Sequence, residues 1–408
     1  MTKCKELPLD DIVTMIDYRG KTPKKSTSGI PLITAKIIKN GRIYTPTEFI
    51  SEDEYVERMT RGFPQIGDIL ITTEAPLGEV AELRDAHVAM GQRIITMHAN
   101  KNLICGKYLK YYLLSHEGQS KLRQRESGTT VTGIKQAELR KVLIPLPPLY
   151  VQQRISRILD TLDDKIELNE KINQNLEAQA QAIFKSWFVD FEPFGGKMPK
   201  DWAKINLSDI ADFVGGYSYK SNELQHSSDA MATIKNFDRN GGFKLDGFKE
   251  IIPSSKLKDI QKVDLFDTLV AHTDLTQNAD VIGNAEMLLS KARYSNIIIS
   301  MDVVKVIPKN GLSKFLLAAL LKDARFKKHC LCYVNGTTVL HLSKKALPEY
   351  IFAFPNNVEN VCDITNLLEG IYRKMARNIE ENTRLSELRD TLLPKLMSGE
   401  IDVSDVAV

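Results

Sequence analysis

The sequence has few cysteines and no long apolar run. Its five cysteines are scattered, with one close pair: Cys4, Cys105, Cys330, Cys332 and Cys362. This number and spacing exclude a disulfide framework and a four-ligand zinc site. The longest aliphatic run, Phe315 to Leu321, is too short to cross a bilayer, and no N-terminal stretch resembles a signal peptide. We therefore expect a cytoplasmic protein without membrane contact.

Motifs for catalysis are also missing. Gly20-Lys21-Thr22 resembles the end of a phosphate-binding loop, but Met15 stands where the first glycine should be. There is no Asn-Pro-Pro or Asp-Pro-Pro motif for amino-methylation, and the histidines show no metal-ligand spacing. Asp163 and Asp164 are adjacent, so on a helix they point about 100° apart and predict a solvated face. We expect no catalytic residue, no metal site and no cofactor bound by this chain.

What the sequence does contain is a long amphipathic segment. Behind Pro145, Pro147 and Pro148, the stretch from about Val151 to Phe188 has no Gly or Pro and predicts one long helix. Its apolar residues recur in steps of four and three if two asparagines are included: Ile155, Leu159, Leu162, Ile166, Asn169, Asn173, Leu176, Ala180, Ile183 and Trp187. A heptad stripe of this kind needs a partner helix.

The same spacing returns from Ile364 to Leu396. The asparagines of the first stripe, Asn169 and Asn173, correspond in this second stripe to Asn378 and Asn382. An asparagine at such a position costs stability but specifies register. We expect the two helices to pair antiparallel, with Asn169 opposite Asn382 and Asn173 opposite Asn378. The alternative is two independent core helices whose stripes match by chance.

The two segments outside the helices are distant copies of each other. The matching pieces are Leu9–Ile12 with Leu207–Ile210, Asn40-Gly41 with Asn240-Gly241, and Gly128-Thr129-Thr130 with Gly336-Thr337-Thr338. Each copy mixes short β-like runs with helices, the clearest helices being predicted at Gly106 to Glu126 and Leu312 to Cys330. The fold class is therefore α+β with a duplicated domain. Folding the helices antiparallel would give a pseudo-two-fold molecule.

This organisation predicts five regions, and charge separates them. They are a first domain at 1–147, a central helix at 148–190, a linker at 191–203, a second domain at 204–355 and a C-terminal helix at 356–408. The first domain carries 22 Lys and Arg against 17 Asp and Glu, and the second carries 20 against 16, so both are basic. The helical regions are acidic, with 5 against 7 and 6 against 10. This asymmetry favours domains that face phosphate and helices that do not.

The helices also carry a family resemblance. PLPPL followed by Gln152 and Ile155, then ILDTLDDKIELN and AQAIFKSWFVDFEPF, closely resembles the first conserved helix of type I restriction–modification specificity subunits. LRDTLLPKLMSGEI, from Leu388 to Ile401, is similar to their C-terminal conserved region. One departure is that Tyr150 and Val151 stand where that family usually has acidic residues.

The resemblance implies a DNA-specificity subunit that recognises an asymmetric, bipartite sequence in double-stranded DNA. It implies two modification subunits that use S-adenosylmethionine to methylate adenine N6, and two restriction subunits that use ATP and Mg. The acidic stretches Asp160 to Glu177 and Glu380 to Asp390, with Lys185 to Phe188, are then the expected docking sites for modification subunits.

Four loops in each domain combine cations, amides and aromatics suited to phosphate and base edges. In the first domain the predicted DNA contacts are Tyr18, Arg19, Lys21, Lys24 and Lys25, then Thr72, Thr73 and Glu74, then Gln92 and Arg93, then Thr129, Thr130 and Lys135. In the second they are Tyr217, Ser218, Tyr219 and Lys220, then His272, Thr273 and Asp274, then Arg293 and Asn296, then Thr337, Thr338 and His341. For any single residue, a solvated surface turn is an equally good interpretation.

Two other functions stay open at this point. A free-standing two-headed DNA-binding or scaffold protein would have the same organisation. An enzyme with a degenerate methyltransferase or nuclease site is the other, and the missing motifs argue against it. A helix of roughly 38 residues spans about 57 Å, more than the about 34 Å of one duplex turn, so it is long enough to separate two half-sites.

Overall fold

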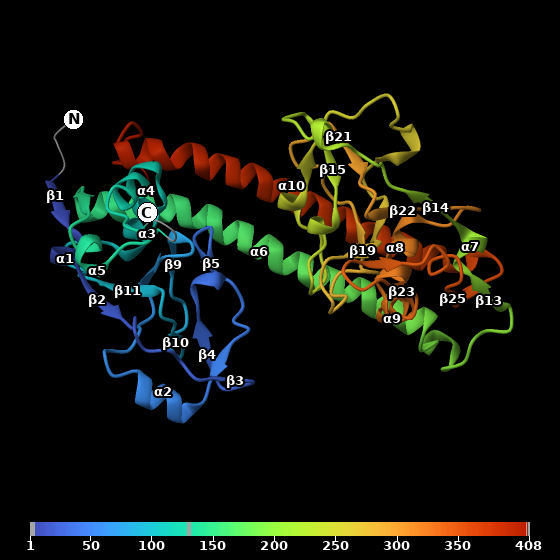
Figure 1. Cartoon of the computed structure of the whole chain (residues 1–408), viewed down its shortest axis with the longest axis horizontal. Coiled ribbons are helices and arrows are strands. Elements are labelled where there is room, and N and C mark those ends of the chain that lie inside the picture. Colours follow the sequence, from blue (N-terminus) through green and yellow to red (C-terminus); the bar gives the residue numbers. More distant parts are fainter. Residues whose placement is uncertain (1–4, 129–131, 405, 407–408) are drawn as a thin grey trace. The chain divides into compact units, whose positions relative to one another are not determined.

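The computed structural model describes residues 5–128, 132–404 and 406 (Figure 1). The chain divides into two compact units. Unit 1 contains residues 1–165 and 385–408, and unit 2 contains residues 166–384. The boundaries between the units fall inside the long helices α6 (Leu149–Phe188) and α10 (Cys362–Ser398), so each unit contains part of each of these helices. Within the described residues, no helix is sufficiently long and apolar to pass through a membrane.

Unit 1 contains short strands and helices that precede α6 in the sequence. Its strands are β1 (Lys5–Pro8), β2 (Val13–Asp17), β3 (Lys25–Ser26), β4 (Ile30–Ile33), β5 (Ile38–Lys39), β6 (Arg42–Ile43), β7 (Phe49–Ile50), β8 (Ile69–Thr73), β9 (Leu77–Glu82), β10 (Ala89–Met90), β11 (Ile94–Ala99) and β12 (Leu143–Leu146). Its other helices are α1 (Leu9–Ile12), α2 (Glu52–Arg58), α3 (Gly106–Leu114), α4 (His116–Arg123) and α5 (Gln136–Leu139), with a 3-10 turn at Ala35–Ile37.

Unit 2 has a related, but not identical, order of elements. Its strands are β13 (Trp202–Asn206), β14 (Ala211–Gly215), β15 (Asp229–Ala232), β16 (Lys249–Glu250), β17 (Lys262–Val263), β18 (Thr268–Ala271), β19 (Thr273–Asp274), β20 (Ala285–Met287), β21 (Asn296–Ile299), β22 (Val303–Pro308), β23 (Val334–Asn335), β24 (Leu340–Leu342) and β25 (Ile351–Pro355). Its other helices are α7 (Leu207–Ile210), α8 (Lys314–Lys322) and α9 (Ala324–Leu331). Short 3-10 turns lie at Glu192–Phe194, Ser221–Glu223, Ile234–Asn236, Leu245–Gly247, Asp259–Gln261 and Val358–Val361.

The largest antiparallel sheet has a matching strand order in the two units. Unit 1 has an antiparallel sheet β2-β11-β8-β9, and unit 2 has β14-β22-β18-β20. A second sheet holds one parallel pair in each unit, β4 with β10 and β15 with β21. The first and last strands also pair, β1 with β12 and β13 with β25. Each unit is α+β, as predicted, and the matching orders agree with the internal sequence repeat.

Two predicted helices are each broken in the middle. Residues 106–123 form α3 and α4, with Ser115 between them in an extended conformation whose side chain accepts from the Gly118 N–H. Residues 314–331 form α8 and α9, and Asp323 caps the second helix by accepting from the Arg325 N–H. The prediction of single helices was wrong because apolar spacing continues across a residue that ends one helix and caps the next.

Within unit 2, asparagines of α6 and α10 form two amide pairs. Asn169 donates to Asn382 at 2.8 Å, and Asn378 donates to Asn173 at 2.7 Å. Asn169 and Asn378 are each 1% exposed. A residue further along α6 thus contacts a residue further back on α10, so these segments run antiparallel. They are the two pairs that the sequence repeat singled out.

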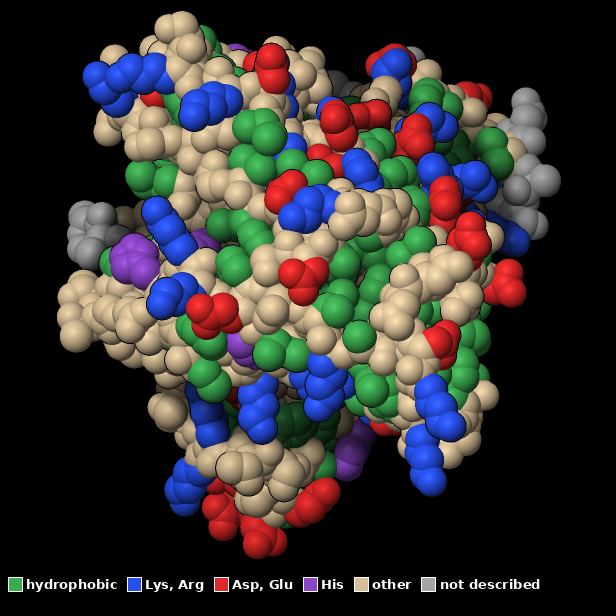
Figure 2. Space-filling view, turned by 90° about the vertical axis from the view of Figure 1, so that its right-hand side faces the viewer, with side chains coloured by type: hydrophobic (Ala, Val, Ile, Leu, Met, Phe, Trp, Pro, Cys, Tyr) green, Lys and Arg blue, Asp and Glu red, His purple; other side chains and the backbone are tan. Residues whose placement is uncertain are grey.

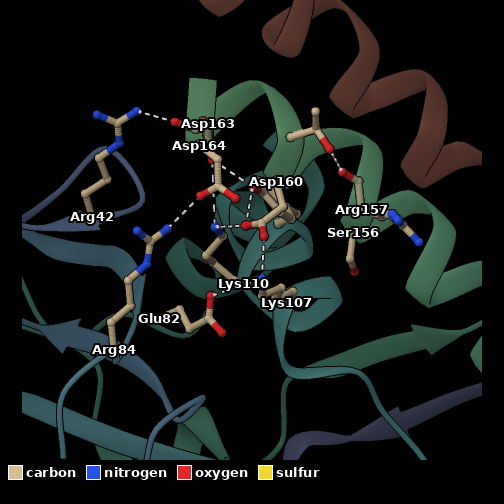
Figure 3. A network of polar contacts seen from close by, with 12 residues as sticks. Arg42, Glu82, Arg84, Lys107, Lys110, Ser156, Arg157, Asp160, Asp163 and Asp164 are labelled. Atoms are coloured by element: carbon tan, nitrogen blue, oxygen red, sulfur yellow. Dashed lines mark hydrogen bonds and ion pairs between the residues drawn. The ribbon is translucent and has the colours of Figure 1, made fainter. Parts of the chain in front are cut away.

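Within unit 1, a buried ionic network joins α3 to α6 (Figure 3). Asp160 accepts from Lys107 and lies 3.6 Å from the Lys110 amine. Asp163 accepts from the Tyr111 hydroxyl at 2.8 Å and pairs with Arg389 of α10 at 2.9 Å. Burial lowers the pKa of Lys110, and the two carboxylates oppose that shift.

The prediction of a solvated face at Asp163 and Asp164 is therefore half wrong. Asp163 is 6% exposed. Asp164 pairs with Arg84 at 3.1 Å in a contact whose two side chains are more than half exposed. Neighbouring helix positions point about 100° apart, so the two carboxylates are separated, and one of them points into the contact between α3 and α6.

These neighbours provide a matched test of the network. We expect Asp163→Asn to lower the free energy of unfolding by about 3 kcal/mol, because it removes one of the two carboxylates beside the buried Lys110 and the buried partner of Arg389. We expect Asp164→Asn to cost less than about 1 kcal/mol, because exposed pairs contribute little. Urea denaturation of the full chain followed by circular dichroism measures both. Equal losses would contradict a stabilising role for the buried network.

Candidate nucleic-acid interface

Four of the predicted loops of unit 1 meet at one hollow. Its lining residues come from the end of β2, the end of β8, the turn before β11 and the segment before α5: Arg19, Gly20, Thr73, Glu74, Gln92, Arg93, Ser127, Gly128, Gly133, Ile134 and Lys135. The structure thus gathers members of all four loops that the sequence proposed separately. Thr129 and Thr130, which were also predicted, lie outside the described residues.

Backbone hydrogen bonds hold these loops together. Thr73 donates its N–H to the Arg93 carbonyl at 2.9 Å, and its own carbonyl accepts the Ile134 N–H at 2.9 Å. Glu74 and Gly133 form a β-bridge beside these bonds. Because backbone groups supply these bonds, the position of the loops does not depend on which side chains the loops carry.

The side chains around the hollow are polar and partly paired. Arg93 contacts Glu74 through Nε at 2.7 Å, and the two side chains are 55% and 42% exposed. Arg19 pairs with Asp17 at 2.6 Å. Lys135 is exposed in front of α5, where it is the N-cap residue. Exposed cations beside amide and carboxylate groups are the combination that phosphate and base-edge contacts need.

The loop after β2 is anchored from beneath by two buried side chains. The Tyr18 hydroxyl donates to the Gly62 carbonyl at 2.5 Å. Arg58 donates to the Lys21 carbonyl and, at 2.8 Å, to the Met90 carbonyl. Burial raises the pKa of Tyr18 and lowers that of Arg58. Sequence reasoning missed Arg58, because nothing in its helical surroundings distinguishes it from a surface arginine.

The remaining cations of this loop lie outside the hollow's lining. Lys21 donates to the Thr60 hydroxyl at 2.9 Å. Lys24 is exposed. Lys25 pairs with Glu48 at 2.9 Å and keeps 55% of its side chain exposed. They form an exposed basic margin on the same loop.

In unit 2, two predicted loops pair as strands β19 and β24. Thr273 is opposite His341, and the Leu342 N–H donates to the His272 carbonyl at 2.9 Å. Thr337 accepts the Gln277 side chain at its carbonyl, and both Thr337 and Thr338 are exposed. Burial, with the nearby His341 and Lys344, lowers the pKa of His272. His341 is exposed.

The loop after β14 is only partly available. Tyr217 is 3% exposed, and its hydroxyl donates to Glu223 at 2.7 Å. Ser218 and Lys220 are exposed, and Tyr219 lies against the Lys249 amine, 5.6 Å from the ring centroid.

Burial removes six predicted residues from the set of DNA contacts. These are Tyr18, Thr72, Thr73, Tyr217, Thr273 and Asp274, each less than 5% exposed. Thr72 accepts the Glu79 N–H, and Asp274 accepts the Thr276 and Val281 N–H groups, so both organise backbone. From sequence alone, polar residues at strand ends are expected on the surface. Here their buried side chains accept backbone N–H groups and so stabilise turns.

Arg293 and Asn296 are exposed but lie apart from the β19–β24 cluster. Arg293 pairs with Glu250 at 2.8 Å, and Asn296 donates to Asp229 at 2.8 Å. These contacts place them at the edge where β15 and β21 begin and β16 ends. The third candidate loop of this unit therefore lies away from the other loops that the sequence proposed.

Charge alone does not mark an interface. On the face shown in Figure 2, Lys and Arg side chains are interspersed with Asp and Glu. Among the described residues, no group of three or more His, Cys, Asp or Glu side chains has the arrangement of a metal site. The loop clusters are thus defined by their geometry and residue types, not by a single-sign field.

Adjacent glycines in unit 2 test how closely the loops pack. A Cβ on Gly216 would lie 1.8 Å from the Ser300 carbonyl oxygen, whereas a Cβ on Gly215 would meet nothing within 4 Å. We expect Gly216→Ala to destabilise the protein by about 1–3 kcal/mol, as overpacking does. Gly215→Ala should stay within about 0.5 kcal/mol of the parent. Thermal unfolding of both variants measures the difference, and equal melting temperatures would contradict the close approach.

Comparison with known proteins shows what this chain is similar to. Residues 1–178 match the model described as the type I restriction modification DNA specificity domain. The chain is 28% identical to the type I restriction enzyme MjaIX specificity subunit of Methanocaldococcus jannaschii, over 92% of this chain and 88% of that protein. It is 27% identical to the type I restriction enzyme HindI specificity subunit of Haemophilus influenzae, over 76% of this chain and 80% of that protein.

A solved structure shares the fold. The S subunit of a type I restriction–modification system from M. genitalium aligns with a TM-score of 0.56 at 16% identity, covering 97% of each chain. The sequence matches support the resemblance to specificity subunits that was predicted from the helices, and the solved structure shows a shared fold.

Proposed function

We propose that this chain, a relative of the type I restriction–modification specificity subunits, selects the DNA sequence on which a restriction–modification complex acts. Each globular region reads one half of an asymmetric bipartite site. The observation that carries this proposal is the pair of loop clusters, each held by backbone bonds and each presenting different exposed polar side chains. The similarity to specificity subunits favours this role over that of a stand-alone two-headed scaffold.

Exposed or half-buried cations would hold the phosphate backbone in both regions. In the first they are Arg19, Lys21, Lys24, Lys25 and Lys135, and in the second Lys220. Glu74, Gln92, Arg93, Ser218, Tyr219, His272, Thr337, Thr338 and His341 remain the proposed base-edge or sugar contacts. Phosphate contacts position a protein, and base contacts give it specificity.

The long helices would act as a spacer with a defined register. Two buried amide pairs in unit 2 restrict sliding, because a shifted register would leave buried amides without partners. We propose that this antiparallel coiled coil separates two target-recognition domains and sets the gap between half-sites.

Catalysis would belong to partner subunits. Two modification subunits, with S-adenosylmethionine, would methylate adenine N6, and two restriction subunits, with ATP and Mg, would cleave DNA. Asp160 and Asp163 are buried, so they leave the proposed docking stretch. Leu168 on α6 is 52% exposed, and it supports docking on the remaining part.

A map of N6-methyladenine tests the function. We expect DNA from cells with this chain and its modification partner to carry a two-part motif with a fixed gap. The motif should be lost when the chain is deleted. A continuous motif would contradict the two-headed arrangement, and a motif that persists without the chain would contradict the specificity role.

Removing one exposed cation tests the interface. Lys135→Ala, in complex with the modification partner, should weaken binding to all sequences and reduce the slope of log affinity against log salt by about 1. Lys101→Ala is the control, because Lys101 is also exposed but follows the opposite end of β11. Fluorescence anisotropy across a salt series measures both. A larger effect of Lys101 would move the interface to that end.

A further inference from the structure

The two loop clusters are built on the same three backbone hydrogen bonds. In unit 1 they run from Gly91 to Ile33 at 2.8 Å, from Thr73 to Arg93 at 2.9 Å and from Ile134 to Thr73 at 2.9 Å. In unit 2 they run from Ser300 to Ala232 at 3.0 Å, from His272 to Asp302 at 2.8 Å and from Leu342 to His272 at 2.9 Å. Each set joins a parallel strand pair, a tight turn and a third segment. We call this set of bonds the frame.

The frame defines which residues of the two units correspond. Counting outward from the shared bonds pairs Arg93 with Asp302, Gln92 with Met301, Glu74 with Thr273 and Gly133 with His341. The sequence had placed Gln92 and Arg93, and Arg293 and Asn296, as the third candidate loops of their domains, whereas the frame pairs Gln92 and Arg93 with Met301 and Asp302. Met301 and Asp302 had no motif to mark them, so sequence reasoning missed both.

Corresponding side chains make the same link with different chemistry. In unit 1, Arg93 Nε contacts Glu74 Oε1 at 2.7 Å. In unit 2, the Thr273 hydroxyl donates to Asp302 Oδ1 at 3.1 Å. The position before each turn residue holds Gln92 in unit 1 and Met301 in unit 2, and Met301 is 52% exposed.

These side chains are not required to build the frame, because backbone groups already make its bonds. An exposed methionine adds little to a fold, since half of its side chain stays in water. The turn therefore presents one cation and one amide in unit 1, and one carboxylate and one thioether in unit 2. A shared backbone frame that carries different side chains is suited to two domains that recognise different sequences.

We propose that the turns Gln92-Arg93 and Met301-Asp302, with Glu74 and Thr273 orienting them, determine which base each unit reads. This rests on the proposed DNA-specificity function. The Arg93 contact uses Nε, and the two terminal Nη groups match the O6 and N7 acceptors of guanine. The Asp302 contact uses Oδ1, and Oδ2 matches the amino donor of cytosine. Met301 supplies an apolar contact for a thymine methyl group.

The test exchanges the three positions between units in the complete complex with its modification partner. The variant T273E/M301Q/D302R transfers the unit 1 residues to unit 2, and E74T/Q92M/R93D does the reverse. Methylation maps of the parent and both variants are compared. We expect each variant to change one or two adjacent positions in a different half-site. Methylation at the original base should fall about tenfold or more, and the gap and the other half-site should stay as in the parent.

Single substitutions keep the test decisive if a triple variant fails to assemble. Met301→Gln alters an exposed side chain, and Asp302→Asn keeps the shape and the acceptor for Thr273, so the same comparison applies to them. Lys256→Ala is the control, because it changes an exposed residue of the same unit outside the frame and outside the proposed contacts, and it should leave both half-sites unchanged.

Three outcomes separate the two proposals. A parent complex without a bipartite motif overturns the proposed function itself. A second outcome is that the parent complex carries such a motif while both half-sites stay unchanged in Met301→Gln, in Asp302→Asn and in every triple variant that assembles. This result overturns only the assignment of these positions. Changes from both units that fall in the same half-site overturn it as well.

Discussion

The long helices bury charged and amide side chains, and each of these groups requires a charged or hydrogen-bonding partner within contact distance. An unpaired charge in a protein interior costs several kcal/mol, so the partners decide how each globular part sits on its helix. In unit 1, Asp160 and Asp163 form ion pairs with Lys107, Lys110 and Arg389, and Asp163 accepts a hydrogen bond from Tyr111. In unit 2, Lys322 lies between Glu286 at 2.7 Å and Glu177 at 3.0 Å. Burial disfavours that cation, yet the two carboxylates outweigh burial and raise its pKa.

The two units meet this requirement with different residues. The unit 1 joint uses two aspartates on α6 against lysines of α3, and the unit 2 joint uses a lysine at the end of α8 against carboxylates of α6 and β20. The duplicated fold therefore kept its backbone and changed its buried charges. A globular part docked on the wrong joint would leave charges unpaired, which penalises that arrangement strongly.

The loop clusters follow the opposite principle. Backbone bonds fix them, and exposed side chains vary upon them. Because a hydrogen-bonded turn can carry almost any side chain at its exposed positions, the frame tolerates Arg93 in one unit and Asp302 in the other. Rigid loops with exchangeable side chains let one fold read many sequences, since specificity then changes without loss of stability.

By itself, the sequence determined the α+β class, the duplication, the long helices and the asparagine register, because periodicity and repeat spacing are local properties of the chain. It also placed Arg93, Glu74 and Lys135 in separate candidate loops. Only the tertiary structure decided that Tyr18, Thr73 and Asp274 turn inward, that Asp163 is buried while Asp164 is not, and that Asp302 rather than Arg293 corresponds to Arg93. Those outcomes depend on which distant backbone groups meet, and neither spacing nor residue type along one chain specifies that.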